Sequence, residues 1–169
     1  MKNKIRLTKS DELTHNYINT GYPNETPHFT YDFINHPDLT QTLAVTASAL
    51  KMAGTFSRVK NLKIKESDRI QTLKSELKKL GIKLKEVDLS SEIDEYDDIS
   101  VETTPSDLKS YDENITIDTH IDHRIAMAFS MAGLVASGPV TVRDCKNVDT
   151  SFPGFVSLAA QAGLSIRVI

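Results

Sequence analysis

Charged side chains are concentrated at the predicted start of a helix near residue 65. Lys65 and Arg69 are one helical turn apart, and Glu66 lies between them. The positive end of a helix dipole disfavours cations and stabilises anions, so two cations there indicate that a negative ligand binds. At about 100° per residue Glu66 falls in line with Ile70 and Leu73, which predicts that its carboxylate points toward the packed side. A solvated helix start with a Glu66–Arg69 ion pair is the alternative interpretation.

Other polar residues lie at the predicted starts of three further helices. They are Asp38, Arg124, and Thr150 with Ser151. If these helix starts faced one cleft, their unpaired N–H groups and partial positive charges would together bind an anion. Helix capping alone also explains Asp38, Ser151 and Asp122, because such side chains satisfy the first amides of a helix. Arg124 is harder to explain in this way, since a cation in a first turn costs free energy unless it is paired.

Several common catalytic and metal-binding patterns are absent from the sequence. His120, Asp122 and His123 lack a further matching set of ligands, so we expect no metal site and interpret Asp122 as a helix cap. There is no glycine-rich phosphate loop and no Gly-x-Ser-x-Gly elbow, which argues against a nucleotide enzyme or a serine hydrolase of those types. Cys145 has no histidine beside it, and we expect an inert thiol.

Alternating strands and helices are predicted to position these residues. Residues 1–28 predict a short strand at 4–8 followed by a loop. Hydrophobic periodicity, glycines and turn residues predict the remaining elements. The first set is a strand at 29–34, a helix from 39 to about 54 with Leu39, Leu43, Ala44, Ala47 and Leu50 on one side, a strand at 55–59, the helix from 65 to Gly81, and strands at 82–87 and 99–102. The second set is a strand at 114–118, an apolar helix at 122–136 between other elements, a strand at 140–143, a helix at 151–162 ended by Gly163, and a strand at 164–168.

This order of elements predicts an α/β (α+β) fold built from two repeats. Residues 29–104 are the first β-α-β-α-β-β repeat and residues 105–169 the second, after a loop or tail of a preceding module at 1–28. Weak internal duplication of this kind is typical of domains assembled from repeated modules, here one incomplete domain. We therefore expect mixed sheets with helices packed against them.

Composition limits the class of protein. The chain has 169 residues, of which 39% are apolar and 25% charged, enough for one sizeable core or two small ones. No apolar run is as long as a membrane span and no signal-peptide core follows the first residues, so we expect a soluble protein without a membrane partner. A single cysteine excludes internal disulfides and is typical of a reducing cytoplasm.

Charge is distributed unevenly along the chain. Residues 60–85 contain nine Lys or Arg against three acids, whereas residues 86–122 contain thirteen acids against one lysine. The basic segment contains no aromatic residue, whereas nucleic-acid surfaces interleave basic and aromatic side chains. We therefore expect no nucleic-acid partner.

Three blocks of residues occur in a characteristic order. They are Asn61-x-x-x-Lys65-Glu66-Ser67-Asp68-Arg69, then Asp122-His123-Arg124-Ile125-Ala126-Met127-Ala128, then Thr150-Ser151-Phe152-Pro153-Gly154-Phe155. Together they resemble the C-terminal part of the 5-enolpyruvylshikimate-3-phosphate synthase (3-phosphoshikimate 1-carboxyvinyltransferase) family. Asp38, 27 positions before Lys65, also falls where that family has an aspartate. The resemblance extends from about Ile5 to the last residue.

The resemblance implies a fold and an activity. The fold is part of the inside-out α/β barrel domain of enolpyruvyl transferases. The activity is transfer of the enolpyruvyl group of phosphoenolpyruvate to the 5-hydroxyl of shikimate-3-phosphate, with release of phosphate, in the shikimate pathway to aromatic amino acids. The reaction uses no metal and no organic cofactor.

The resemblance also implies roles for four charged residues. Arg69 and Arg124 would clamp phosphoenolpyruvate, since a planar guanidinium binds carboxylate and phosphate groups through two bonds. Asp38 would take the proton of the 5-hydroxyl as general base, and Glu66 would deliver or remove the proton on the methylene carbon.

Three further residues are implied to contact the substrates. Lys65 and Asn61 would hold the substituents of the shikimate ring and stabilise the tetrahedral intermediate. Thr150 stands where many members have a lysine that helps to hold phosphoenolpyruvate, while other members have a threonine. The threonine therefore changes the expected affinity for phosphoenolpyruvate more than it changes the family to which the sequence is similar.

Parts of the family's active site have no counterpart in this sequence. The family enzyme has two similar domains of three modules each, and its site lies between them. We therefore expect this chain to supply a C-terminal half-site, to need the missing N-terminal domain as partner, and to be inactive alone. Two alternatives remain, namely a related enolpyruvyl transferase that acts on a UDP-amino sugar and a non-catalytic anion-binding module.

Overall fold

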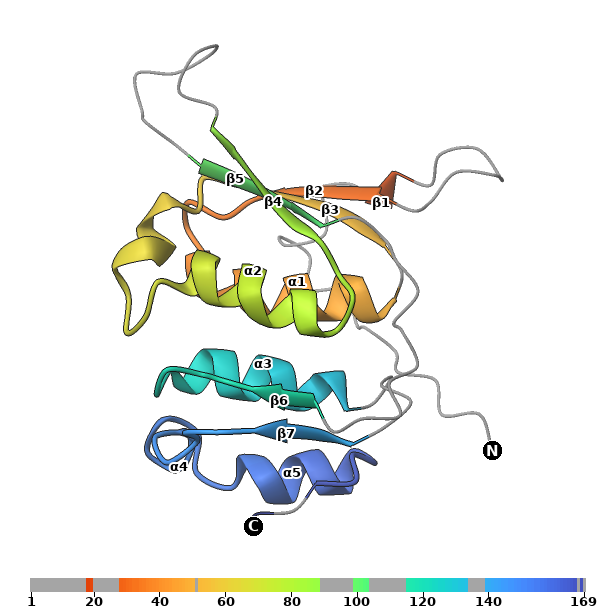
Figure 1. Ribbon diagram of the computed structural model, residues 1–169, viewed down its shortest axis with the longest axis vertical. Coiled ribbons are helices and arrows are strands. Elements are labelled where there is room, and N and C mark those ends of the chain that lie inside the picture. Colours follow the sequence, from red (N-terminus) through yellow and green to blue (C-terminus); the bar gives the residue numbers. More distant parts are fainter. Residues whose placement is uncertain are drawn as a thin grey trace.

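A five-stranded sheet forms the outer layer of the structure, and a pair of strands lies on the other side of the central helices (Figure 1). The computed structural model describes residues 18–19, 28–50, 52–88, 99–103, 115–133, 139–166 and 168. The order of strands in the sheet is β1 (Ile18–Asn19), β2 (His28–Asp32), β3 (Ala53–Ser57), β5 (Ile99–Thr103) and β4 (Leu84–Asp88). The separate pair consists of β6 (Ile115–Ile117) and β7 (Val140–Val142).

Two pairs of neighbouring strands are parallel, and in each pair a helix connects the two strands. β2 and β3 are parallel and are connected through the 3-10 turn η1 (Pro37–Leu39) and helix α1 (Thr40–Ala49). β6 and β7 are also parallel, and α3 (His123–Ala132) connects them. Parallel neighbours cannot be joined by a tight hairpin, so each pair requires such a crossover. The remaining pairs of the large sheet are antiparallel.

Helices α1, α2 (Arg69–Lys79) and α3 lie between the two sets of strands, whereas α5 (Phe155–Gln161) lies outside them (Figure 1). Figure 1 shows α1 and α2 under the large sheet, α3 below them, and α5 beyond β7. α1 packs directly against α3, and α3 also contacts β7. Fully buried side chains from these layers form one continuous core that includes Phe33, Phe56, Leu73, Ile117 and Phe129. The predicted placement of the apolar helix at 122–136 between other elements is therefore confirmed.

Most predicted strands occur within a few residues of their predicted bounds. The predicted strands at 29–34, 55–59, 82–87, 99–102, 114–118 and 140–143 correspond to β2, β3, β4, β5, β6 and β7. Gly81 after α2 and Gly163 after α5 have φ angles of 80° and 101°, the left-handed conformation expected where a helix stops. The predicted strand at 4–8 lies outside the described residues, as does the end of the helix predicted at 122–136 beyond residue 133.

Two predictions near the ends of the chain are wrong. The segment predicted as a loop up to residue 28 contains β1, which pairs with β2, and His28 already belongs to β2. The described residues of the segment predicted as a strand at 164–168, which are 164–166 and 168, have no strand.

The helix predicted from residue 65 begins four residues later. A 3-10 turn, η2 (Lys60–Ile64), comes first, and α2 starts at Arg69. The side chain of Asp68 accepts a hydrogen bond from the N–H of Gln71 at 2.9 Å and so caps the helix at that point. Lys65 and Glu66 therefore lie before the helix, and the helical period does not apply to them. The prediction that Glu66 points toward the packed side is wrong, because its side chain is 48% exposed.

The buried side of α1 differs from the predicted one. Ala44 and Ala47 are buried as predicted, but Leu39, Leu43 and Leu50 are exposed. Other residues of the helix are buried instead, and they are Thr40, Gln41, Val45 and Ser48. Small side chains let α1 approach α3 closely, so packing and not hydrophobicity alone decides which face is covered.

The helix predicted at 151–162 is two helices. α4 (Val148–Ser151) ends before Phe152, and α5 starts after Gly154. Pro153 disfavours a helical conformation at Phe152, and Gly154 has a φ of 82°, so the chain turns between them. Thr150 and Ser151 consequently lie inside a short helix and not at the start of a long one.

A buried carboxylate joins α2 to the residues that follow β6. Glu76 is almost completely buried. Its Oε2 accepts hydrogen bonds from the N–H of Asp118 at 3.0 Å and from Nζ of Lys79 at 2.5 Å. The two β-α-β units are therefore connected through side chains as well as through apolar packing.

Candidate active site

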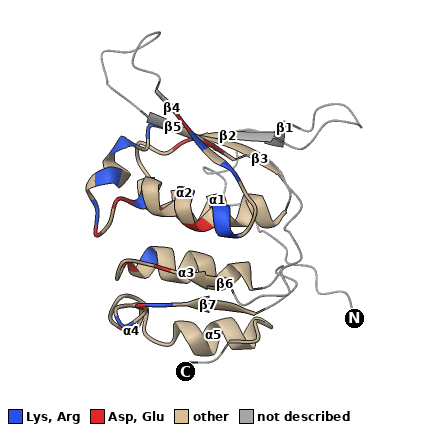
Figure 2. Cartoon of the chain, viewed as in Figure 1, with Lys and Arg blue, Asp and Glu red and all other residues tan. Residues whose placement is uncertain are grey.

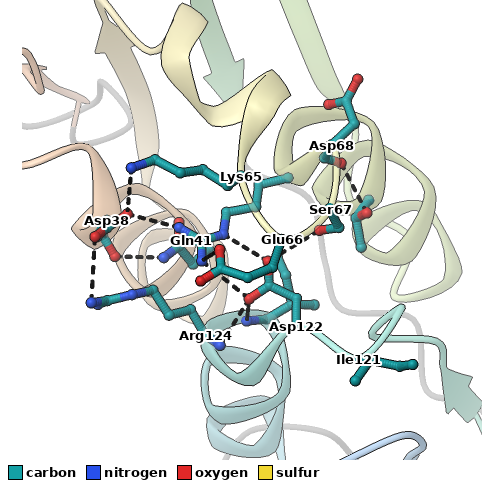
Figure 3. A network of polar contacts seen from close by, with 12 residues as sticks. Asp38, Gln41, Lys65, Glu66, Ser67, Asp68, Ile121, Asp122 and Arg124 are labelled. Atoms are coloured by element: carbon teal, nitrogen blue, oxygen red, sulfur yellow. Dashed lines mark hydrogen bonds and ion pairs between the residues drawn. The ribbon is translucent and has the colours of Figure 1, made fainter. Parts of the chain in front are cut away.

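Charged residues from separate parts of the chain lie together at one end of the central helices. Figure 2 shows charged positions in η2, in the segment before α2 and at the first turn of α3, all at the same end of the molecule. Figure 3 shows the side chains of Asp38, Lys65, Glu66, Asp122 and Arg124 pointing toward one another. The structure thus brings Asp38, Lys65, Glu66, Arg69 and Arg124 into a single network, which we call the Arg69 cluster and to which Asp122 also belongs.

Arg69 is the centre of this cluster. Its side chain is only 1% exposed, and its guanidinium reaches three carboxylates. Nε lies 2.7 Å from Asp122 Oδ2, Nη1 lies 2.7 Å from Asp38 Oδ1, and Nη2 lies 2.5 Å from Glu66 Oε2. A charge withdrawn from water is tolerated when its donors are all engaged in this way. The Glu66–Arg69 pair expected under the alternative interpretation is thus present, but it belongs to a larger arrangement.

Asp122 is the innermost carboxylate of the cluster, with no exposed side-chain surface. Its Oδ1 accepts hydrogen bonds from the N–H groups of Arg124 at 2.9 Å and Ile125 at 3.3 Å, which confirms that it caps α3. Its Oδ2 accepts from Ser67 Oγ at 3.1 Å as well as from Arg69. Burial alone would raise the pKa of Asp122, but the bonds and charge of Arg69 with the two N–H groups outweigh it and hold that pKa below its usual value.

Asp38 is the carboxylate on the accessible side of the cluster. Besides Arg69, it pairs with Arg124 Nη2 at 3.3 Å and Lys65 Nζ at 3.6 Å. The side chains of Asp38, Arg124 and Lys65 are between 32% and 38% exposed, so a ligand in solvent can reach all three. The amide of Gln41 donates to the backbone carbonyl of Asp38 at 2.5 Å and holds the η1 turn that carries it.

The helix starts contribute less to the site than the sequence predicts. Asp68 caps α2 and Asp122 caps α3, so the first amides of these helices are already bound to carboxylates of the chain. Of the two interpretations that the sequence leaves open at these helix starts, the structure therefore shows capping. Asp38 was also interpreted as a helix cap, but η1 and α1 have no side-chain cap. Positive charge reaches solvent through the side chains of Lys65 and Arg124 instead.

Two predicted site residues lie outside the ion-pair network. Asn61 is part of η2, and its Oδ1 is buried without a hydrogen-bond partner among the described residues. Thr150 lies in α4, where its hydroxyl donates to the backbone carbonyl of Asn147 at 2.8 Å. The amide of Asn147 in turn donates to the carbonyl of Ile121, the residue before Asp122. Hydrogen bonds through Asn147 thus connect Thr150 to the segment that leads into the cluster.

Part of the cluster was not predicted from the sequence. Asp122 was expected only to cap a helix, but its side chain also binds Arg69 across 53 positions of sequence. Ser67 and Gln41 had no predicted role, and they bind Asp122 and the backbone carbonyl of Asp38 respectively. Ser67 and Asp122 lie inside the family-like blocks, which was the available signal, whereas nothing in the sequence marks Gln41.

Other chemistries have little support in the described part of the chain. Burial and the neighbouring charge of Asp144 raise the pKa of the Cys145 thiol, which disfavours a reactive thiolate. Among the residues that the structure describes, no group of three His, Cys, Asp or Glu is placed to hold a metal ion. None of the described helices is both long and apolar enough to cross a membrane.

Comparisons with known proteins point to one family. Residues 5–158 match the family model of EPSP synthase (3-phosphoshikimate 1-carboxyvinyltransferase). The 3-phosphoshikimate 1-carboxyvinyltransferase of Methanobrevibacter smithii is 33% identical over 158 residues, which cover 94% of this chain and 32% of that protein. The corresponding enzyme of Nitrosococcus oceani is 45% identical over 106 residues, 63% of this chain and 21% of that protein.

Solved structures give the same result. An EPSP synthase from Acinetobacter baumannii superposes with a TM-score of 0.59 at 37% sequence identity, over 78% of this chain and 28% of that one. A second structure from the same organism gives a TM-score of 0.58 at 35% identity. The mixed α/β arrangement is therefore similar to that of EPSP synthase structures. The chain spans between about a fifth and a third of the length of these relatives.

Proposed function

Because the chain belongs to the EPSP synthase (3-phosphoshikimate 1-carboxyvinyltransferase) family, we propose that the Arg69 cluster forms one side of an enolpyruvyl-transfer site. The reaction moves the enolpyruvyl group of phosphoenolpyruvate to the 5-hydroxyl of shikimate-3-phosphate and releases phosphate, a step of aromatic amino acid biosynthesis. One observation carries the proposal: Asp38, Lys65, Glu66, Arg69 and Arg124 come from three separate segments and meet in one network that solvent reaches.

Phosphoenolpyruvate binds to the cations of the cluster. Its carboxylate and phosphate match the guanidinium of Arg124 and the ammonium of Lys65, which are partly exposed and bind only Asp38 among the carboxylates of the described chain. Arg69 is buried, and the two carboxylates on its accessible side are Asp38 and Glu66. A substrate anion binds Arg69 by replacing Asp38 or Glu66. Substrate binding therefore also releases that carboxylate from its ion pair with Arg69.

The carboxylates released in this way carry the proton transfers. Asp38 takes the proton of the 5-hydroxyl as general base, and Glu66, which is exposed, exchanges a proton with the methylene carbon. Asp122 stays in place, since it is fully buried and bound to the first amides of α3. The cluster therefore contains both mobile and fixed acids.

The remaining substrate contacts come from neutral groups and from Lys65. Asn61 binds a hydroxyl of shikimate-3-phosphate, a role supported by its buried and unpartnered Oδ1. Lys65 stabilises the charge of the tetrahedral intermediate. Thr150 contacts phosphoenolpyruvate from the α4 side, with weaker attraction than a lysine at the same position. The mechanism uses no metal or organic cofactor.

We also propose the finer architecture that the resemblance implies. Residues 29–104 and 105–169 are two repeats of one incomplete domain, within an inside-out α/β barrel. Both regions contain a parallel β-α-β unit followed by a further helix, which supports this division. The proposed location of the protein is the cytoplasm, supported by its single cysteine and by the reaction itself.

A chimeric enzyme tests the proposal. The 169-residue chain replaces the matching segment of the Acinetobacter baumannii enzyme, and phosphate release is measured with phosphoenolpyruvate and shikimate-3-phosphate. We expect turnover by this chimera and none by the chain alone, because the chain corresponds to 28% of that enzyme. Asp38→Asn should lower kcat by about 10²-fold to 10⁴-fold, the usual contribution of a general base.

The matched control is Asp149→Asn, which changes an exposed aspartate of α4 outside the cluster and should leave kcat unchanged. Turnover of a UDP-amino sugar by the chimera would favour the related transferase. Phosphate release that does not respond to Asp38→Asn would contradict the assigned base. Turnover by the chain alone, near that of the full-length enzyme, would contradict the proposal of a partial site.

A further inference from the structure

The segments that follow β6 and β7 are held together by a series of hydrogen bonds. The N–H of Arg143 donates to the carbonyl of Ile117 at 3.0 Å. The hydroxyl of Thr119, which is fully buried, lies 2.9 Å from the carbonyl of Arg143 and 3.1 Å from that of Asp144. The two strands are parallel, so both segments begin at the same end of the β6–β7 pair. The first segment leads to Asp122 and Arg124, and the second leads to Thr150.

The first of these segments contains a strained turn. His120 and Ile121 have φ angles of 50° and 63°, the left-handed region that residues with a side chain rarely adopt. The conformation is least favourable for a β-branched residue such as Ile121. The side chain of Ile121 is also exposed, so its own burial does not offset the strain. Such a conformation persists only when surrounding contacts enforce it.

Asn147 supplies a contact that enforces this turn. Its amide nitrogen donates to the carbonyl of Ile121. The backbone carbonyl of the same residue accepts from the hydroxyl of Thr150 at 2.8 Å and from the N–H of Ser151 at 3.2 Å. Asn147 therefore binds the strained turn through its side chain and α4 through its backbone.

The position of the turn decides where two members of the Arg69 cluster lie. Asp122 follows Ile121 directly and binds Arg69, and the N–H of Arg124 binds Asp122 Oδ1 (Figure 3). We propose that Asn147 is a positioning residue, which holds Ile121 in its strained conformation and thereby aims Asp122 and Arg124 at Arg69 and Asp38. The predicted effect of Asn147 on the reaction rests on the proposed function, whereas its role in positioning the turn does not.

Hydrogen exchange on the 169-residue chain tests the positioning directly. In Asn147→Ala the amide protons of Arg124 and Ile125, which bind Asp122 Oδ1, should exchange at least about tenfold faster, while those of the β2–β3 pair stay unchanged. Ile121→Asn, added to Asn147→Ala, should restore slow exchange, because asparagine tolerates the left-handed region. Asn147→Asp, which is isosteric but lacks the donor, should act like Asn147→Ala and serves as the second variant if Asn147→Ala does not fold.

The control is Ser130→Ala, which removes a hydrogen bond of 2.8 Å to Ala126 inside α3, away from the turn. It should leave the exchange of the Arg124 and Ile125 amides unchanged. Equal acceleration in all elements after Asn147→Ala would mean that Asn147 only stabilises the fold, and unchanged exchange would mean that the contact positions nothing. Either result overturns the proposal, as does a failure of Ile121→Asn to rescue.

The chimera extends the test to the reaction. Asn147→Ala should lower kcat/KM for phosphoenolpyruvate by about tenfold, and Ile121→Asn in the same chain should recover most of this loss. A normal kcat/KM despite accelerated exchange would overturn the link to the cluster. If the unmodified chimera lacks activity, the proposed function fails, whereas the exchange experiment still decides the role of Asn147.

Discussion

The guanidinium of Arg69 lies 2.7 Å from the carboxylate of Asp122, and both side chains are withdrawn from solvent. This buried ion pair joins the first residue of α2 to the cap of α3. The pair offsets its loss of hydration through several bonds, since Asp122 also accepts from Ser67 and from two amides of α3. Substitutions at either residue therefore measure how much the pair contributes to stability.

Removing Arg69 should be costly for folding. Arg69→Met leaves Asp122 buried without its cation, and breaking one partner of a buried ion pair costs about 3–5 kcal/mol. We expect the free energy of unfolding to fall by that amount in urea denaturation. The double variant Arg69→Met with Asp122→Asn should lose less than the sum of the two single variants, because the uncompensated charge is gone. Strict additivity of the two changes would contradict the coupling.

The pair also predicts how stability depends on pH. Because the pKa of Asp122 is lowered in the fold, its ionised form contributes stability above the ordinary pKa of about 4. That contribution is lost as the pH falls through the native pKa. The difference in unfolding free energy between the unmodified chain and Asp122→Asn should thus be large at pH 7 and smaller at pH 3. Asp149→Asn, at an exposed position, should show a small difference at both values.

Anion binding should depend on the exposed cations of the cluster. Arg124→Met is expected to weaken binding of phosphoenolpyruvate to the chain by about tenfold to 150-fold, since a charge-assisted hydrogen bond contributes about 1.5–3 kcal/mol. Calorimetric titration at low salt measures the effect, and added salt should reduce it. Arg143→Met is the matched control, because Arg143 is an exposed arginine for which the structure has no ion pair to the cluster. Equal losses in both variants would indicate unspecific attraction.

Two glycines near the C-terminus should respond differently to alanine. Gly154 has a φ of 82° and open space where a Cβ would lie, so Gly154→Ala measures conformational strain, about 1 kcal/mol of destabilisation. Gly133 ends α3 with a φ of −61°, which alanine adopts freely, although its Cβ would lie 3.3 Å from the carbonyl of Ser130. Gly133→Ala should therefore change stability by less than about 0.5 kcal/mol. Thermal unfolding of both variants compares them.

Local patterns predicted the elements better than their contacts. The alternation of strands and helices and the stops at Gly81 and Gly163 were correct, because each depends on a few neighbouring residues. The helix α2 starts four residues later than predicted, because Asp68 caps it and residues 65–68 are not helical. The break at Pro153 and Gly154 had a clear signal that was overlooked. The exposed leucines of α1 could not be predicted, because close packing against α3 selects the face with small side chains.

For the Arg69 cluster, too, the sequence predicted the residues better than their contacts. Family-like blocks indicated which residues matter, and Asp38, Lys65, Arg69 and Arg124 do lie together. Arg69 binds Asp38 and Asp122 across 31 and 53 positions of sequence, and no local pattern contains such contacts. The buried position of Arg69 depends on these long-range bonds. Their assigned roles remain proposals that the experiments above address.

Helix α2 is fastened at two points to the second β-α-β unit. Arg69 holds the cap of α3, and Glu76 holds the backbone that follows β6. The two residues are seven positions apart, about 10 Å along a helix axis. A single attachment would act as a pivot, but two attachments at this spacing resist rotation about either one. The two units should therefore move as one rigid body during any opening or closing of the site.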